Sequence, residues 1–189
     1  QRLAAALFDR APSHDNHRSS NAPTGEPPTP TSLLESDELA LRMTGIGGTG
    51  VVTVAQIVGT AAMLDGWTVQ GLDQIGLSQK AGPVVSDLRF TRNGSTRSNR
   101  LGPGDADVLI ALDQLTAAGE RGLGVVDGHT VVIGSDSRVP TGSMIPHPEL
   151  VAPDADALDA RIAAVAGDGT RLWADAAGIA TEHLGDATS

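Results

Sequence analysis

The sequence of 189 residues contains no cysteine and no tyrosine, and only two phenylalanines and two tryptophans. Without thiolates the chain cannot form a disulfide, and it cannot by itself ligate an iron–sulfur cluster, whose irons are held by cysteine. Aromatic residues make up 2% of the chain and apolar residues 40%. A core must therefore be built from valine, isoleucine, leucine and alanine.

Basic residues are also scarce: 13 lysines and arginines face 23 aspartates and glutamates, for a net charge of −10. This balance argues against nucleic acid as a partner, because neutralising phosphates requires clustered basic side chains. No uninterrupted apolar stretch is long enough to span a bilayer, and no signal peptide is recognisable. We expect a soluble, cytoplasmic protein that binds neither nucleic acid nor membrane.

Residues 1–40 lack the pattern of a folded domain. Residues 1–8 resemble the end of a preceding helix, and residues 9–32 hold five prolines among polar residues, which is typical of a linker. His14 and His17 have no third ligand nearby, so we predict no metal site there. The chain does not begin with methionine and ends directly after a predicted helix. We expect a piece of a longer protein: a preceding-domain remnant and linker over residues 1–40, and a domain truncated at its carboxyl end over residues 41–189.

The most informative stretch runs from Gly45 to Gly50 (GIGGTG), between a short apolar run and a long one. This order predicts a strand, a glycine turn and a helix, with the G-x-G-x-x-G spacing. Glycines permit positive φ and a close approach of the backbone to a ligand. The following helix directs unpaired N–H groups and its positive dipole end at the turn, where phosphate is the usual guest. The alternative is a turn that merely packs helix against strand. The candidate residues are Gly45, Gly47, Gly48, Thr49 and Gly50.

The predicted helix from Val51 to Leu64 is apolar nearly all round. Only Thr53, Gln56 and Thr60 form a narrow polar stripe. Such a helix is usually covered on more than one side. We therefore expect that this domain works inside an assembly.

Further strands are predicted over residues 67–73, 84–90, 107–113, 130–134 and 171–174, with a short helix and turn between 114 and 129. Longer helices are predicted from the N-cap Asp154 to a stop at Gly167, and from Ala176 to Leu184 after the N-cap Asp175, with a stop at Gly185. The alternation predicts an α/β fold, a three-layer α/β/α sandwich with a mostly parallel, Rossmann-like sheet. Asp87 and Arg89 are expected to share the solvent face of their strand. Residues 91–104 carry three arginines that either meet a phosphate or an acidic partner, or form a solvated hairpin tip.

A second candidate loop follows the strand over residues 67–73. Asp73 lies at the distance past the glycines where a dinucleotide-binding fold keeps its ribose-binding acid, so a free-standing NAD(P)-binding Rossmann domain is one hypothesis. Against it, the next residues form a polar, glycine-bounded loop with the single lysine of the chain, and no helix opens there. No nucleophile, base or metal constellation is complete, so we predict no catalytic residue. The candidate binding residues of this loop are Asp73, Gln74, Gly76, Ser78, Gln79, Lys80 and Gly82.

The stretches TGIGGTGVVTVAQIVGTAAMLDG, LDQIGLSQKAGPVVSDLRF, DADVLIALD, PTG at 140–142 and HLGDATS occur here in order. Together they resemble the gamma domain of 2-oxoacid:ferredoxin oxidoreductases, in particular the fused indolepyruvate-type enzyme. The resemblance covers about residues 41–189, and the LDQ-x-GLSQK-x-G segment is its most specific part. Gly45 to Gly50 match the glycine loop of that family, and Gln74 to Gly82 match its second loop.

The resemblance implies oxidative decarboxylation of a 2-oxoacid to an acyl-CoA, with electrons passed to ferredoxin. It also implies that thiamine diphosphate with Mg and the iron–sulfur clusters lie in other domains or subunits, and that CoA serves the complete enzyme. The gamma domain would then pack against the thiamine-binding and ferredoxin-like domains and meet ferredoxin only indirectly. Such a domain is expected to be inactive alone, and its two loops would contact CoA, substrate or a neighbouring domain.

Overall fold

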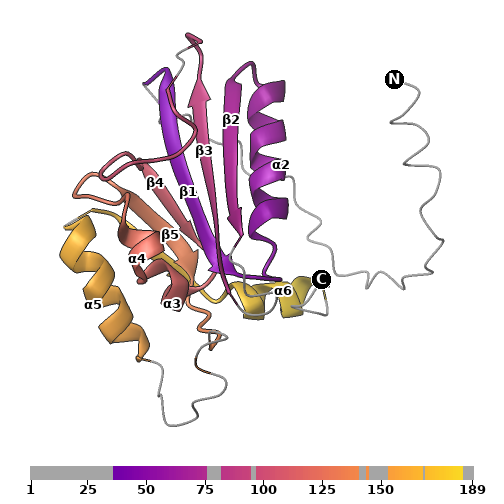
Figure 1. Ribbon diagram of the computed structural model, residues 1–189. Coiled ribbons are helices and arrows are strands. Elements are labelled where there is room, and N and C mark those ends of the chain that lie inside the picture. The colour runs from indigo at the N-terminus through magenta and orange to yellow at the C-terminus, as the bar shows by residue number, and fades with distance from the viewer. Residues whose placement is uncertain are drawn as a thin grey trace, which may run out of the picture.

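The computed structural model describes residues 36–75, 82–94, 97–140, 144, 153–167 and 169–184. Its described part contains one six-stranded sheet in the order β2-β3-β1-β4-β5-β6 (Figure 1). The strands are β1 (Glu38–Ile46), β2 (Thr68–Ile75), β3 (Pro83–Thr91), β4 (Val108–Ala111), β5 (Val131–Ser135) and β6 (Arg171–Ala174).

Strands β1, β4, β5 and β6 pair in parallel, whereas β3 is antiparallel to both β1 and β2. Strand β2 therefore runs in the same direction as β1, and β3 alone opposes the rest of the sheet. This confirms the predicted α/β class with a mostly parallel sheet. The insertion of β3 between β1 and β2 was not predicted, and it separates two strands that are neighbours in a dinucleotide-binding sheet.

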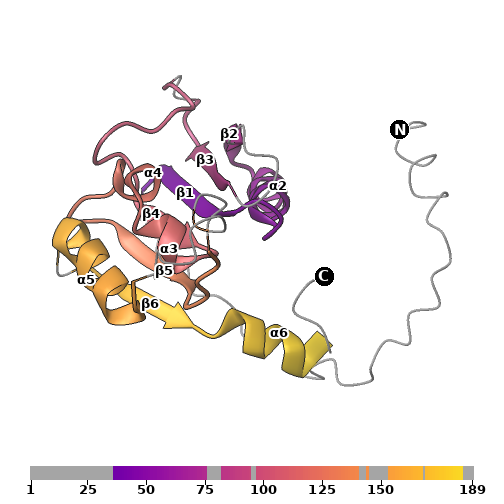
Figure 2. The same ribbon diagram turned by 60° about the horizontal axis from the view of Figure 1, so that its bottom comes forward.

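Helices cover both faces of the sheet. Helix α2 (Val51–Leu64) packs over β1, β2 and β3, and α3 (Gln114–Ala117), α4 (Glu120–Leu123) and α5 (Ala155–Ala166) lie on the opposite face (Figure 2). Strand β4 shows the two faces in its alternation: Leu109 joins the core under α5, while Ile110 joins the core under α2. The last helix, α6 (Ala176–Leu184), leaves β6 and extends past the sheet. The three-layer arrangement is thus confirmed.

Local signals set the helix bounds as predicted. Helix α2 begins after Gly50, and α5 lies between its N-cap Asp154, whose carboxylate accepts a hydrogen bond from the Ala157 N–H at 2.8 Å, and Gly167 at φ 60°. Among the described residues, no helix combines the length and the apolar character needed to cross a membrane.

The prediction that Asp87 and Arg89 face solvent is wrong. Asp87 is fully buried and Arg89 is 8% exposed, because the segment after β3 folds back over this face of β3. Arg42 of β1 donates from Nε and Nη2 to the two carboxylate oxygens of Asp87, both at 2.7 Å. Arg89 donates from Nη2 to Asp105 at 2.6 Å. Asp87 and Arg89 thus lie on the same face of the strand, as expected, but that face is buried and each side chain is paired with an opposite charge.

Candidate functional site

The glycine loop joins the carboxyl end of β1 to the amino end of α2. Gly48 and Gly50 have φ of 98° and 83°, and a Cβ at either position would meet nothing within 4 Å. Their left-handed backbone, and not a lack of space, therefore requires glycine. At Gly45 the reason is different, because a Cβ would lie 2.6 Å from Thr49 Oγ1 and 2.7 Å from Val51 Cγ2. Gly45 lets strand and helix approach closely.

Hydrogen bonds hold the loop in shape and connect it to the next segment. Thr49 donates to the Ile46 carbonyl oxygen from both its backbone N–H (3.0 Å) and its hydroxyl (2.7 Å). The Gly47 N–H donates to the Gly82 carbonyl oxygen at 2.9 Å. Gly82 immediately precedes β3, so the structure brings the glycine loop and the far end of the second candidate segment into contact.

The amino end of α2 offers backbone N–H donors that have no side-chain cap among the described residues. Gly50 is the N-cap and supplies no side-chain hydrogen bond, and the first turn contains no acidic residue. The loop residues 47–49 are exposed. An apolar helix of fourteen residues thus presents its first N–H groups and positive dipole end beside an open loop. This arrangement suits an anionic ligand or the acidic or carbonyl groups of a neighbouring domain.

The other two described members of the predicted set point to opposite faces of the sheet. Asp73 lies on the α2 face, where the Ser86 hydroxyl donates to its Oδ1 at 2.6 Å. Gln74 lies on the α4 face. With β3 between them, β2 and β1 are about 10 Å apart, twice the spacing of adjacent strands. Asp73 therefore does not stand beside the glycine loop as a ribose-binding acid does, which argues against the NAD(P) hypothesis. Gly76, Ser78, Gln79 and Lys80 lie outside the described residues, and their roles remain predictions.

The hollow beside Gln74 was not predicted. It has a volume of about 590 Å³ and is bordered by Arg42, Arg100 and Arg121. Arg42 forms the buried ion pair with Asp87, and its Nη1 also donates to the Arg121 carbonyl oxygen at 2.7 Å. The signal in the sequence was an arginine in the middle of a largely apolar strand, since a charge at such a position needs a buried partner.

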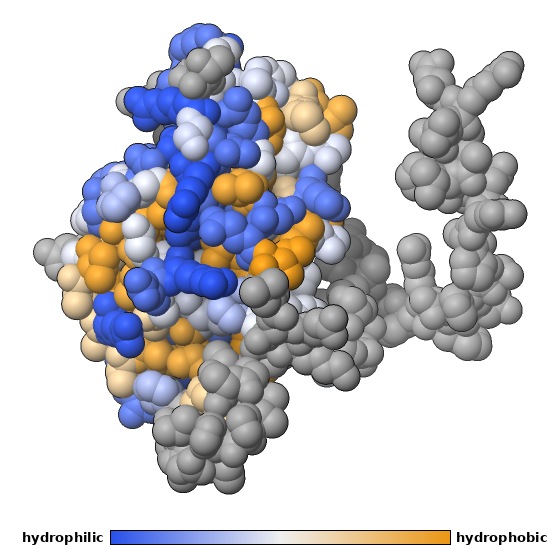
Figure 3. Space-filling model, in the orientation of Figure 1, coloured by the Kyte–Doolittle hydropathy of each residue, from blue (hydrophilic) through white to orange (hydrophobic). Residues whose placement is uncertain are grey.

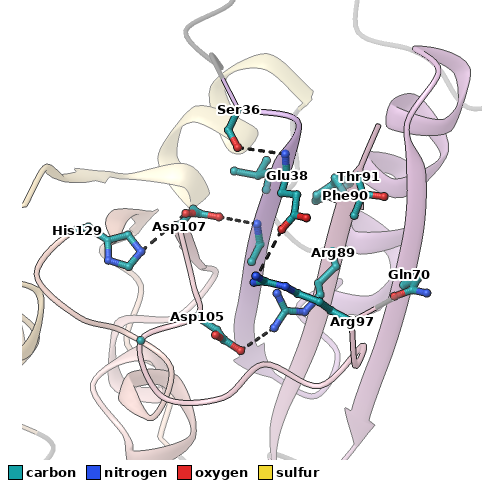
Figure 4. A pocket seen from close by; sticks show the side chains of 13 residues that line it. Ser36, Glu38, Gln70, Arg89, Phe90, Thr91, Arg97, Asp105, Asp107 and His129 are labelled. Atoms are coloured by element: carbon teal, nitrogen blue, oxygen red, sulfur yellow. Dashed lines mark hydrogen bonds and ion pairs between the residues drawn. The ribbon is translucent and has the colours of Figure 1, made fainter. Parts of the chain in front are cut away.

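A second polar pocket, of about 280 Å³, lies at the amino end of β1 (Figure 4). Its charged groups are paired with one another: Arg89 with Asp105, and Arg97 with Glu38 at 3.8 Å. The hydrogen bond from the Gly102 N–H and the charge of Arg89 lower the pKa of Asp105 below its ordinary value. Among the described residues, no group of three acidic or histidine side chains is placed to hold a metal ion. We interpret the paired charges around this pocket as interactions that stabilise the fold, and we do not interpret the pocket as a ligand site.

The fold and loop define a three-layer α/β domain that presents a glycine loop at the start of an apolar helix. The sequence model of the pyruvate ferredoxin/flavodoxin oxidoreductase family matches residues 40–188. The chain belongs to this family.

Two similar proteins are indolepyruvate oxidoreductase subunits IorB. That of Methanothermobacter thermautotrophicus is 29% identical over 106 residues, which is 55% of this chain and 52% of that protein. That of Thermococcus kodakarensis is 33% identical over 81 residues, which is 42% of this chain and 39% of that protein. The chain thus spans about half or less of the length of these relatives.

Two solved structures share the fold. The pyruvate oxidoreductase subunit PORC of Thermotoga maritima has a TM-score of 0.53 and 15% identity, over 81% of this chain and 70% of that one. The 2-oxoglutarate:ferredoxin oxidoreductase of Magnetococcus marinus has a TM-score of 0.52 and 18% identity, over 78% of this chain and 22% of that one.

Proposed function

We propose that this chain is the gamma-domain component of a 2-oxoacid:ferredoxin oxidoreductase that acts on an indolepyruvate-like substrate. The carrying observation is the match of the family model over nearly the whole of the described fold, glycine loop included. The relatives that support the substrate class are subunits of indolepyruvate oxidoreductase. In this proposal the complete enzyme decarboxylates the 2-oxoacid oxidatively to an acyl-CoA and passes the electrons to ferredoxin in the cytoplasm.

The proposal gives this chain a binding role and no catalytic one. Thiamine diphosphate, Mg and the iron–sulfur clusters belong to partner domains, in keeping with a sequence that has no cysteine. The exposed side of α2 supports a partner interface. Ile57 is 62% exposed, Met63 54% and Leu64 85%. A helix with that many apolar side chains in water is a candidate surface for contact with another domain.

We further propose that the glycine loop and the segment from Gln74 to Gly82 contact CoA. Two features support this: the donors at the amino end of α2, and the hydrogen bond that ties Gly47 to Gly82. The Magnetococcus enzyme, which shares the fold, is described with 2-oxoglutarate, coenzyme A and succinyl-CoA bound. The pyrophosphate of CoA is an anion of the kind that a helix amino end accepts, and a lysine such as Lys80 would add a positive charge.

The test is steady-state kinetics of the assembled enzyme with Lys80→Ala. We expect a higher KM for CoA, with the KM for the 2-oxoacid unchanged and co-purification with the thiamine-binding partner intact. Arg161→Ala is the matched control, since Arg161 is exposed on α5, on the other face of the sheet. An unaltered KM for CoA would remove Lys80 from the site. A chain that never associates with a thiamine-binding partner would contradict the proposed function as a whole.

A further inference from the structure

Strand β2 forms one edge of the sheet. Among the described strands it pairs with β3 alone, along its full length of eight residues, TVQGLDQI. In an antiparallel pair, every second residue of an edge strand turns its N–H and C=O away from its neighbour. Proteins usually protect such an edge with lysine, proline or a short strand. This strand contains neither lysine nor proline, and with eight residues it is not short. One of its carbonyl oxygens, that of Gly71, already accepts a hydrogen bond from the Asn99 side chain at 3.1 Å.

On the α2 face, a groove of about 300 Å³ runs beside this edge. Its floor is Val69, Gly71 and Leu88, its wall is α2 with Gly59 and Met63, and polar side chains at its border are Gln56, Thr60 and Asp73. The glycines keep the groove open: a Cβ at Gly59 would stand 3.5 Å from Val69, and one at Gly71 would stand 3.3 Å from Leu88. A strand added beside β2 would direct every second side chain here. Small apolar side chains fit this groove.

On the other face, two arginines line hollows beside the same edge. A hollow of about 450 Å³ is lined by Gln70 of β2 and by Arg97, and the larger hollow is lined by Gln74 of β2, by Arg100 and by Glu120. Arg97 has its side chain 62% exposed, and its acidic partner Glu38 is 3.8 Å away. Arg100 is exposed and makes no ion pair with a described residue. Figure 3 shows strongly hydrophilic side chains gathered over the upper and central part of this face.

We propose that the edge of β2, which pairs with no second described strand, binds an extended segment of a partner protein by β-strand addition. The segment carries acidic side chains on alternate positions, four residues apart where they meet Arg97 and Arg100, and small apolar side chains between them. The main-chain hydrogen bonds supply affinity, and the two hollows supply specificity. Charge complementarity favours this occupant on the arginine face, because Arg97 and Arg100 are both exposed there in a chain of net charge −10.

A second copy of this chain fits the edge less well. Paired about a two-fold axis, it would present Thr68, Gln70, Leu72 and Gln74 on the arginine face, and none of these is acidic. It would also bring the arginines of both copies to the same edge, where like charges repel. The inference does not involve the glycine loop and does not rest on the proposed function, and among the residues that line its groove and hollows only Gln74 belongs to the segment proposed to contact CoA.

The experiment measures fluorescence anisotropy of labelled nine-residue peptides on the full chain. The probes are an alternating Glu–Val peptide and an alternating Lys–Val peptide. General electrostatics with a chain of net charge −10 favour the Lys–Val peptide, so a preference for Glu–Val by at least about tenfold supports the arginine-flanked edge. Arg97→Glu combined with Arg100→Glu should weaken Glu–Val binding by about tenfold or more. The control Arg161→Glu carries the same kind of charge reversal on α5 and should leave binding unchanged.

Two further peptides test the backbone pairing. Each is the Glu–Val peptide N-methylated on one of the two alternating sets of amides. Since only one set faces β2, one peptide should lose binding and the other should keep it. Equal binding by both methylated peptides, a preference for Lys–Val, or the same affinity in the double variant and the control would overturn the proposal. A stable dimer of the unmodified chain by sedimentation that blocks the Glu–Val peptide would also overturn it, in favour of a second copy. The peptide comparisons on the unmodified chain decide the matter even if the double variant does not fold.

Discussion

Removal of Asp87 should be among the most destabilising single changes in this protein. Its carboxylate is fully buried, and the Arg42 side chain that it binds is 7% exposed. In Asp87→Ala the guanidinium keeps its charge and loses both hydrogen bonds to the carboxylate, and only the bond from Nη1 to the Arg121 carbonyl oxygen remains. Breaking one partner out of a buried ion pair typically costs about 3–5 kcal/mol. The Leu101 N–H, which donates to Asp87 at 3.2 Å, loses its acceptor as well.

The double variant Arg42→Met with Asp87→Leu removes both charges. It therefore measures the loss of the ion pair without the cost of leaving the Arg42 charge buried and unpaired. We expect it to lose only about 1–3 kcal/mol, because what remains is mainly the unpaired Leu101 N–H and Arg121 carbonyl. The assay is urea denaturation followed by circular dichroism. Asp65→Ala is the control, since Asp65 is exposed and 4.0 Å from Arg92, and it should change stability by less than about 1 kcal/mol. If Asp87→Ala costs no more than this control, the pair is not desolvated and the reasoning fails.

Two further predictions concern stability. Gly45→Ala should destabilise the chain by about 1–3 kcal/mol in the same assay, because the added Cβ would lie 2.6 and 2.7 Å from its nearest neighbours. Gly47→Ala should be the milder change, because the nearest contact there is 3.6 Å. The reverse order of the two destabilisations would contradict the assigned packing. The Gly102 N–H hydrogen bond and the charge of Arg89 lower the pKa of Asp105, so its stabilising contribution is complete above about pH 4 and is lost as the pH falls through the lowered pKa. Asp105→Asn should therefore reduce the fall of the unfolding free energy below pH 4, and an unchanged slope there would refute this assignment.

Local structure was largely predictable. The bounds of α2, α5, β6 and α6 agree with the predictions, because helix periodicity, N-cap aspartates and glycine stops act within a few residues of each other. The glycine loop was placed correctly for the same reason, since a positive φ is a property of one residue at a time. The apolar character of α2 predicted that a neighbouring domain covers part of it. In the described residues Ile57 and Leu64 are exposed, and the covering domain stays a prediction.

Strand pairing and side-chain burial were harder to predict from the sequence. An alternating strand such as β3 looks the same whether its polar face meets water or another segment, and this is why Asp87 and Arg89 were placed in solvent. The hollow beside Gln74 depends on residues from β1, β2, α4 and the segment after β3, which meet only once the sheet is assembled.

By itself the sequence determined the kinds of most elements, the bounds of the longer helices and the glycine turn before α2, because these follow from local backbone preferences and short-range capping. The tertiary structure decided the strand order, and with it the position of β3 between β1 and β2, the separation of Asp73 from the glycine loop, and the place of β2 at the edge of the described sheet. Strand order depends on contacts between residues far apart in the chain. Alternating apolar residues indicate that one face of a strand is buried, but they do not indicate which neighbour buries it.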